Sequence, residues 1–222
     1  MLTLVADRPK GPFRPAGKNY HLLDGQTYFT RFFPVSDGIL VNHHSMSGGD
    51  VYFAPLKQAV VDAEGTLRLK WWKGNERLKH RPIDVRPPRD GAAPIAMLAN
   101  TFDPGAGLVL EGTVTMPALT DRKPVGLFIE HADRSGTALL VRPGGVIEIG
   151  SMQADGAGFA VKSRVDRELS LRPAARFRLL MKYSLVEFYL DDHLIQCWSV
   201  PGSPTGRIGL IGRGIDDLHA WQ

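Results

Sequence analysis

Apolar residues alternate with polar ones in short runs along this sequence, and turn-forming residues separate each run from the next. This period of two residues is typical of β-strands, and Gly, Pro, Asn and Asp between the runs favour turns. No stretch of three helical turns carries an apolar stripe at helical spacing. The strand-like runs are QTYFTRFFPV, GILVNHHSM, DVYFAPLKQAVVD, GTLRLKWW, GLVLEGTVTM, PVGLFIEHA, TALLVRPGGVIEIGSM, RFRLLMKYSLVEFYLDDHLIQCWSV and GRIGLIG. The chain is therefore predicted to be all-β.

The spacing of the later runs indicates how the strands are packed. They recur about every 8 to 12 residues, which is typical of two stacked antiparallel sheets. Residues 91–222 are predicted to form a β-sandwich with jelly-roll or concanavalin-like connections. Residues 1–85 are predicted to form an antiparallel β-hairpin segment packed beside it. The stretch RPIDVRPPRDGAAP, residues 81–94, is rich in Pro, Arg and Asp and is the expected boundary.

Two hairpins are predicted with their turns. Asp62 to Gly65 connects two strand-like runs, with the glycine at the position that needs a positive φ. In LVEFYLDDHLIQCW, Asp191 and Asp192 form the turn. Alternation assigns Val186, Phe188 and Leu190 to one face of the first strand, and Leu185, Glu187 and Tyr189 to the other.

Charge and composition disfavour several classes of protein. The formal net charge is +4 over 222 residues, with no block of five like charges, so nucleic-acid binding is not predicted. Cys197 is the one cysteine, so an intrachain disulfide cannot form, and its apolar neighbours predict a small core residue. The sequence contains neither a signal-peptide pattern nor an apolar run long enough to span a membrane, so a soluble chain is expected.

Several stretches resemble a known group of enzymes. The segments VADRPKGPFRP, TYFTRFFPVSDGILVNHHS and YFAPLKQAVVDAEGTLRLKWWKGNERLK are similar to the last blade of the five-bladed propeller in glycoside hydrolases related to families 32, 43 and 68. The segment from FRLLMKYSLVEFYLDD to the end resembles the β-sandwich that follows that propeller. The resemblance implies that residues 1–85 correspond to about one blade. It also implies that the catalytic carboxylates belong to earlier blades, outside this chain.

Three functional hypotheses follow. The first is a non-catalytic glycoside hydrolase portion that binds glycan or stabilises a catalytic propeller. The second is a stand-alone β-sandwich glycosidase, with Glu130, Glu148 and Glu187 as the acids to test, since glycoside hydrolysis needs two carboxylates. The third is a self-associating structural protein, because a lone blade would expose apolar flanks.

Sugar binding commonly combines aromatic faces with directional polar groups. Trp71 and Trp72 are adjacent, so in a strand their indoles point to opposite faces, and one of them is expected to seal the blade against the sandwich. His43 and His44 pose the same choice, and the resemblance implies that one of them lines the propeller axis. The glycan-binding candidates are Trp71, Trp72, Arg31, Asn42, His43, His44 and Asn75, with Tyr189, Trp198 and Trp221 as further aromatic residues.

Metal binding has weaker sequence support. No histidine or cysteine spacing typical of a zinc site occurs. Asp216 and Asp217 are candidates for calcium, but a calcium site takes about six to eight oxygen ligands, and one aspartate pair does not specify it. No organic cofactor is expected.

Overall fold

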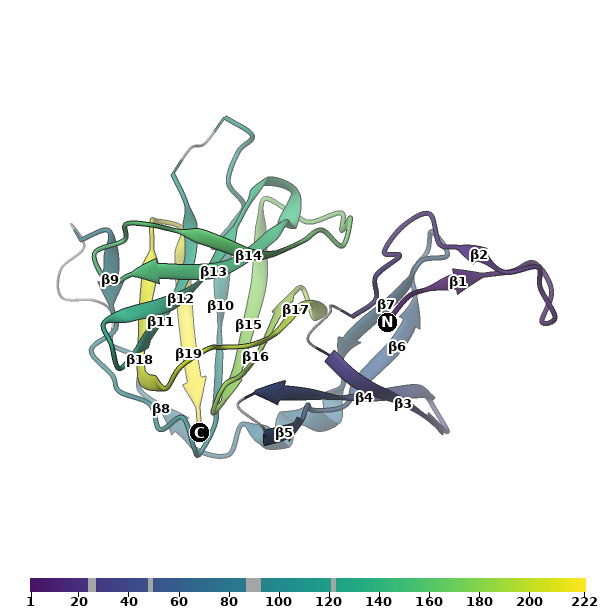
Figure 1. Cartoon of the computed structure of the whole chain (residues 1–222), viewed down its shortest axis with the longest axis horizontal. Helices are drawn as coiled ribbons and strands as arrows, with labels where there is room; N and C mark the ends of the chain where they lie inside the picture. The colour runs from purple at the N-terminus through teal and green to yellow at the C-terminus, as the bar shows by residue number, and fades with distance from the viewer. Residues whose placement is uncertain (24–26, 48–49, 87–92, 121–122) are drawn as a thin grey trace.

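A computed structural model of the chain describes residues 1–23, 27–47, 50–86, 93–120 and 123–222, and these residues form an all-β protein (Figure 1). A six-stranded sheet stacks on part of an 11-stranded sheet to form a sandwich, and the rest of the larger sheet, built from residues near the N-terminus, extends beside it and is called the N-terminal sheet (Figure 1). The predicted antiparallel sandwich is confirmed. The predicted boundary stretch lies partly outside the described residues.

The elements before residue 90 are β1 (Leu4–Val5), β2 (Arg14–Pro15), β3 (Thr27–Val35), β4 (Gly38–Ser47), β5 (Asp50–Phe53), β6 (Lys57–Val61), β7 (Leu67–Trp71), the 3-10 helix η1 (Lys73–Leu78) and β8 (Pro82–Ile83). The later elements are β9 (Ile95–Met97), β10 (Leu108–Thr115), β11 (Val125–His131), β12 (Ser135–Val141), η2 (Pro143–Gly145), β13 (Ile147–Gln153), β14 (Ala160–Val165), β15 (Ala174–Lys182), β16 (Leu185–Leu190), β17 (His193–Ser199), β18 (Pro204–Ile211) and β19 (Ile215–Trp221).

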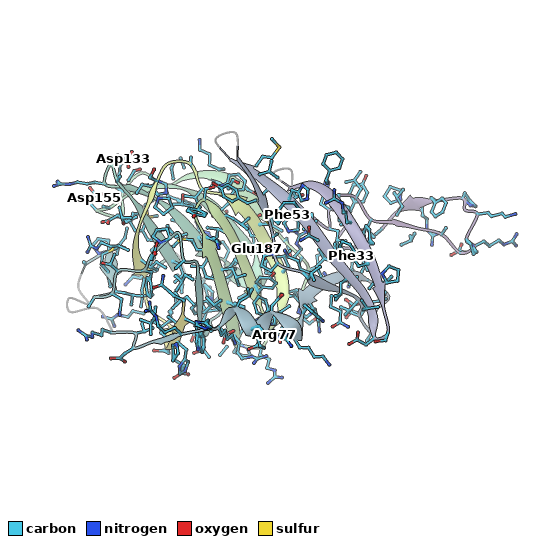
Figure 2. All side chains as sticks on the ribbon, turned by 90° about the horizontal axis from the view of Figure 1, so that it is seen from below. Phe33, Phe53, Arg77, Asp133, Asp155 and Glu187 are labelled. Carbon is cyan, nitrogen blue, oxygen red and sulfur yellow. The ribbon has the colours of Figure 1, made fainter. Side chains whose placement is uncertain are left out.

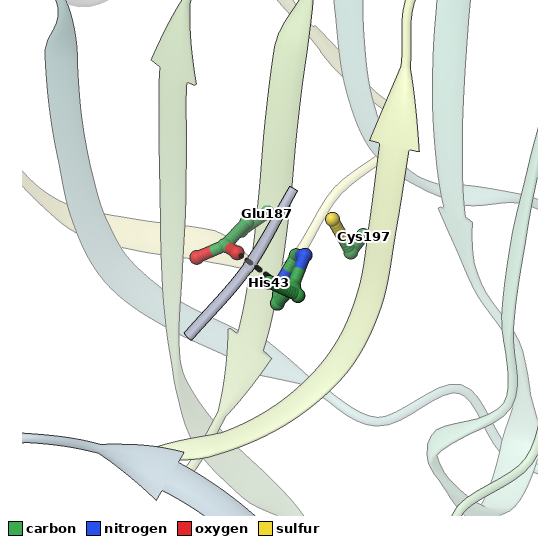
Figure 3. A group of neighbouring side chains, drawn as sticks. All are labelled: His43, Glu187 and Cys197. Atoms are coloured by element: carbon green, nitrogen blue, oxygen red, sulfur yellow. Dashed lines mark hydrogen bonds and ion pairs between the residues drawn. The ribbon is translucent and has the colours of Figure 1, made fainter. Parts of the chain in front are cut away.

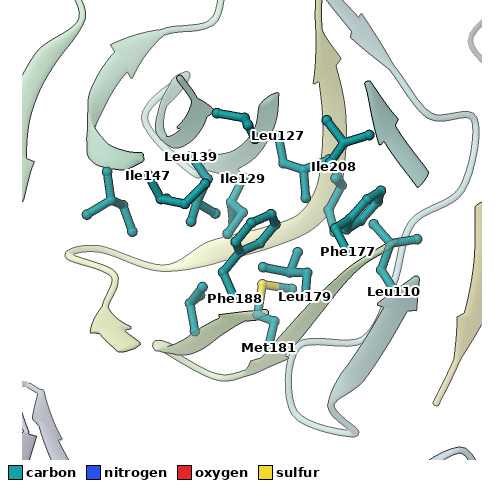
Figure 4. Packing of buried hydrophobic residues seen from close by; sticks show 14 of the residues in the cluster. Leu110, Leu127, Ile129, Leu139, Ile147, Phe177, Leu179, Met181, Phe188 and Ile208 are labelled. Atoms are coloured by element: carbon teal, nitrogen blue, oxygen red, sulfur yellow. The ribbon is translucent and has the colours of Figure 1, made fainter. Parts of the chain in front are cut away.

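The sandwich consists of one sheet in the order β14-β13-β12-β11-β18-β9 and a second in the order β17-β16-β15-β10-β19-β8. Apolar side chains from the inner faces of both sheets fill the space between them (Figure 4). Phe177 of β15 and Phe188 of β16 stack near its centre, with ring centroids 6.0 Å apart. Burial of this apolar surface is the main driving force for the packing of the two sheets.

The N-terminal sheet has the strand order β3-β4-β6-β7, with β5 paired to β4. A meander of four antiparallel strands is the form of one propeller blade. The sheet continues into the sandwich, because Lys70 of β7 pairs with His193 of β17 and the Trp71 N–H donates to the Asp192 carbonyl at 2.7 Å. Strand β8, which precedes residue 85, pairs with β19 of the sandwich.

Both predicted hairpins are present. Asp191 and Asp192 have φ values of 42° and 65°, and two successive positive values at a two-residue turn indicate a type I′ geometry. Gly65, with φ of 80°, lies in the β6–β7 turn, where Asp62 Oδ1 accepts the N–H groups of Glu64 and Thr66. The predicted alternation of β16 is also confirmed: Val186, Phe188 and Leu190 face the sandwich core.

A second apolar cluster joins the N-terminal sheet to the outer face of the sandwich. It explains why Tyr189, on the other face of β16, is fully buried as well. The cluster contains Leu22, Leu23, Val41, Leu69, Trp71, Val109, Leu180, Tyr189 and Leu194. The N-terminal sheet and the sandwich therefore share a core, and their relative orientation is fixed by packing.

The two adjacent tryptophans have different surroundings. Trp71 is 8% exposed, and its ring lies 5.6 Å from Tyr189 edge-on and 4.1 Å from the guanidinium carbon of Arg178. Its indole N–H donates to Glu76 Oε1 at 2.6 Å. Trp72 is half-buried, and its six-membered ring lies over Gly74. Trp71 is therefore the residue that seals the N-terminal sheet against the sandwich.

We expect Trp71→Ala to destabilise the fold by roughly 3 to 5 kcal/mol, the usual cost of truncating a buried aromatic side chain. Trp72→Ala should cost clearly less, because its indole is half-exposed and lies outside the shared core. Urea unfolding of the two variants and the parent chain measures the difference. Equal destabilisation by both substitutions would contradict this assignment.

Candidate functional site

Four polar side chains form a buried cluster between the N-terminal sheet and the sandwich. We call His43 of β4, Lys57 of β6, and Glu187 and Tyr189 of β16 the charged cluster. The side chains of all four are fully buried. Figure 2 shows Glu187 between the two parts of the molecule, whereas Phe33 and Phe53 lie on the N-terminal sheet. The register of β4 with β6, which pairs Val41 with Lys57, brings His43 close to the ammonium group.

Every polar atom of the Glu187 carboxylate has a partner. Lys57 Nζ donates to Glu187 Oε1 and also to the Pro55 carbonyl at 2.8 Å. The Tyr189 hydroxyl donates to Glu187 Oε2 at 2.7 Å. His43 Nε2 lies 3.1 Å from Glu187 Oε1 and 3.0 Å from Lys57 Nζ. The cluster thus meets the requirement that a buried charge be both paired and hydrogen-bonded.

The cluster shifts the pKa values of its members in directions that preserve the pairing. Burial by itself would raise the pKa of Glu187, but the charge of Lys57 and the hydrogen bonds from His43 and Lys57 outweigh it and hold the pKa at about 2. Burial, reinforced by the charge of Lys57, lowers the pKa of His43. Burial and the nearby Glu187 charge raise the pKa of Tyr189 well above its usual value. At neutral pH the carboxylate is ionised and His43 and Tyr189 are neutral.

His43 and Glu187, together with Cys197 of β17, place their ligand-type atoms within 4.8 Å of one another (Figure 3). They are the one group of this kind among the residues that the structure describes. The Lys57 ammonium already contacts both His43 Nε2 and Glu187 Oε1, so it supplies the positive charge at this point. This geometry favours a structural ion pair over a metal centre.

The opposite side of the N-terminal sheet carries several solvent-exposed apolar residues around the buried His44, which is 7% exposed. We call Arg31, Phe33, Asn42, His44, Met46, Val51 and Phe53 the open face. The strand register of β3, β4 and β5 places their side chains on one side of the sheet. Arg31 Nη1 lies 2.9 Å from His44 Nε2, and the His44 ring lies 4.3 Å from that of Phe53.

The open face therefore contains three of the predicted glycan-binding residues, Arg31, Asn42 and His44. Its large apolar residues are strongly exposed: Phe33 by 42%, Met46 by 48%, Val51 by 49% and Phe53 by 68%. His43 points to the other side of the sheet. The choice that the sequence left open is settled: His43 is in the interior and His44 borders solvent-exposed side chains.

The three predicted acids lie in separate surroundings and share no partner. Glu130 accepts hydrogen bonds from Thr205 and Arg207 near the edge of the sandwich. Glu148 is held by Arg142 and Arg164. Glu187 is sealed in the charged cluster, where a glycan cannot reach it without separating the sheets. The arrangement pairs each acid with a cation and places no two of them around one substrate site.

The remaining candidates occupy varied positions. Asn75 is 6% exposed, and its side chain donates to the Leu56 carbonyl at 2.7 Å. Asp216 and Asp217 are exposed on β19, where Asp217 Oδ2 accepts from Thr113 at 3.4 Å. Trp198 and Trp221 are half-buried and pack on the two apolar clusters.

A cleft of about 450 Å³ separates the N-terminal sheet from the sandwich, and no sequence pattern predicted it. One wall comes from β5 and η1, and the other from β10, β15 and the turn between β15 and β16. Tyr52 of β5 and Tyr183 of the β15–β16 turn meet at this cleft as a tilted aromatic pair, with ring centroids 6.0 Å apart. Of the predicted residues, only Asn75 lines it. Tyr183 was missed because a single tyrosine in a turn has no sequence pattern that distinguishes it.

Among the residues that the structure describes, no helix is long and apolar enough to cross a lipid bilayer.

By sequence, neither a protein-family model nor a curated protein matches this chain. By structure, it is similar to a family 32 β-fructofuranosidase from Bombyx mori, with a TM-score of 0.66 and 10% identity over 95% of this chain and 42% of that one. A fructan 1-exohydrolase from Cichorium intybus gives 0.61 and 12% identity, over 90% of this chain and 48% of that one. A sucrose-6-phosphate hydrolase from Lactobacillus gasseri gives 0.61 and 14%, over 90% and 42%.

The chain thus spans less than half the length of these enzymes. At the level of the fold, the predicted resemblance to the part of such hydrolases that carries the β-sandwich is confirmed.

The charged cluster leads to a prediction about its two ionic partners. Lys57→Met should destabilise the fold by roughly 3 to 5 kcal/mol, because it leaves the Glu187 carboxylate buried without a countercharge. The double variant Lys57→Met/Glu187→Leu should be less destabilised than Lys57→Met alone, since no buried charge remains. Urea unfolding of the single and double variants measures both effects. Lys18→Met, which removes an exposed ion pair with Glu64, is the control and should change little. A double variant at least as unstable as Lys57→Met alone would contradict the prediction.

The same cluster predicts loss of stability in acid. The lowered pKa of His43 means that the unfolded chain binds a proton more readily, so stability falls as the pH drops through 6.5, the ordinary value. Glu187 adds a second loss as the pH falls from its ordinary 4.5 towards about 2, on the order of 3 kcal/mol in full. Unfolding measured between about pH 7 and about pH 3 should show a smaller loss for Lys57→Met/Glu187→Leu than for the parent chain. Identical pH profiles would show that the cluster does not control acid stability.

Proposed function

We propose that this chain is the non-catalytic, sandwich-bearing part of a glycoside hydrolase, and that its N-terminal sheet packs as one blade against a catalytic β-propeller. The observation that carries the proposal is the open face. Phe33, Met46, Val51 and Phe53 present apolar side chains on one side of a rigid sheet. Grouped apolar exposure of this kind is typical of a surface that another protein covers.

The partner that suits this face is another antiparallel sheet. Propeller blades pack face to face through apolar side chains, and a four-stranded meander such as β3-β4-β6-β7 is the repeating unit of that architecture. The sandwich and the charged cluster hold the N-terminal sheet in one orientation, so its open face is preformed. A preformed surface loses less conformational entropy when its partner binds.

The structural comparisons support the same partner and suggest its substrate class. The similar enzymes are more than twice as long as the region they share with this chain, so each contains a further part. Two of the similar structures are described as complexes with sucrose and with 1-kestose. We propose that the complete assembly acts on a fructose-containing sugar, and that its acids come from the propeller.

The two alternative functions have less support. A stand-alone glycosidase would need two accessible carboxylates around one site, and Glu130, Glu148 and Glu187 have no such arrangement. A self-associating structural protein would use the same open face, with a second copy in place of a propeller. Light scattering separates this alternative, because self-association through the open face would raise the apparent mass with concentration.

The test is to co-express the chain with the propeller encoded directly upstream of it, and to measure co-elution and sucrose hydrolysis. We expect the two to co-elute, with hydrolysis dependent on both. Phe33→Glu, which places a charge in the open face, should abolish co-elution. Val161→Glu is the control, because Val161 has a similar exposure of 50% but lies on β14 of the sandwich. Absence of an upstream propeller, or co-elution that survives Phe33→Glu, would overturn the proposal.

A further inference from the structure

We propose that the cleft between β5 and the β15–β16 turn is a binding site for a short, uncharged oligosaccharide. Its volume of about 450 Å³ falls within the range of roughly 300 to 1,000 Å³ that is usual for small-molecule sites. The floor is apolar and well ordered by packing, since Leu108, Val109, Met181 and Leu185 are each less than a tenth exposed. The inference rests on the proposed function only for the class of ligand.

The two tyrosines form the recognition surface. Tyr183 is 50% exposed, and its main-chain N–H donates to the Pro104 carbonyl at 2.8 Å. A Cβ placed on Gly105 would lie 3.4 Å from Tyr183 Cε1, so the loop around Gly105 supports the Tyr183 ring. Tyr52 is half-buried and packs beside Tyr183, with the two rings inclined by 35°. The exposed part of the Tyr183 ring, held in place by Tyr52, offers an apolar face to the C–H groups of a sugar.

The backbone of Tyr183 is unusual for a bulky side chain. Its φ is 50°, in the left-handed region that glycine and asparagine occupy most readily and that is unfavourable for a bulky side chain. It occupies the first position of a two-residue hairpin turn between Lys182 and Leu185, where glycine is the usual residue. A tyrosine retained at this position costs conformational energy, and such outliers concentrate at binding sites. The consequence of this backbone conformation is that the Tyr183 ring lines the cleft.

The polar groups of the cleft indicate a neutral ligand with many hydroxyls. Lys182 is the one charged residue among the described residues that line it, and it makes no ion pair within the described part of the chain. Asn75 uses its amide N–H₂ on the Leu56 carbonyl, which leaves the amide oxygen as an acceptor. Gln222 adds a further amide to the lining. No Asp or Glu side chain is among the described residues that line the cleft, which disfavours cations, and a single lysine disfavours polyanions.

The test uses the purified chain and isothermal titration with 1-kestose and with maltotriose. We expect at least one trisaccharide to bind. Tyr183→Asn should weaken that binding at least about tenfold through loss of one aromatic contact, while the midpoint of thermal unfolding stays equal or rises. The asparagine tolerates the positive φ, so lost binding cannot be attributed to misfolding. Tyr52→Leu should weaken the same binding, because Tyr52 holds the Tyr183 ring in place.

Arg134→Asn is the matched control. Arg134 has φ of 62° in the β11–β12 turn, so this substitution makes the same backbone change outside the lining of the cleft. It should leave sugar binding unchanged, and so should Phe33→Glu on the open face, which separates this inference from the proposed packing against a propeller. Failure to bind either sugar, or undiminished binding by Tyr183→Asn, would overturn the inference. Binding of the apolar dye ANS in the cleft without sugar binding would also overturn it.

Discussion

The burial of the Glu187 carboxylate is the constraint on which the rest of the structure depends. A carboxylate between the N-terminal sheet and the sandwich needs a countercharge, and the side chain of Lys57, on β6, reaches it from the N-terminal sheet. Tyr189 and His43 then occupy the remaining positions around it. Since a buried ion pair contributes little net stability over an apolar replacement, we interpret the cluster as a device that fixes the register of the N-terminal sheet. The apolar contacts of Trp71 and its neighbours supply the stability.

Local pattern predicted the β-strands well, because alternation and turn chemistry act within a few residues. The hairpin over β16 and β17 has the predicted turn and the predicted inward face, because Val186, Phe188 and Leu190 alternate strictly. The burial of the opposite face could not be predicted in the same way. The countercharge of Glu187 is Lys57, which lies 130 residues earlier in the chain. A single lysine in a strand usually indicates a solvent-exposed face, so the sequence alone gave no reason to pair it with a buried acid.

The candidate site was predicted in part for the same reason. Alternation required His43 and His44 to face opposite ways, but only the fold could assign them, because register depends on long-range pairing. Arg31, Asn42 and His44 come together because the β3–β4 register pairs Arg31 with Asn42, and this pairing connects two runs whose register the local pattern does not specify. Tyr183 could not be predicted for a different reason: its unusual feature is a positive φ, which only the structure reveals.

The open face and the cleft are coupled through the element that separates them. Strand β5 carries Val51 and Phe53 on the open face, and the same strand lines the cleft, where Tyr52 packs beside Tyr183. Its position depends on β4, whose His43 lies in the charged cluster. A shift of the N-terminal sheet relative to the sandwich would therefore change the cleft width and the direction of the open face together. Packed interfaces of this kind move between discrete arrangements rather than deforming gradually. The charged cluster thus bears on the direction of the apolar sheet face and on the width of the tyrosine-lined cleft together.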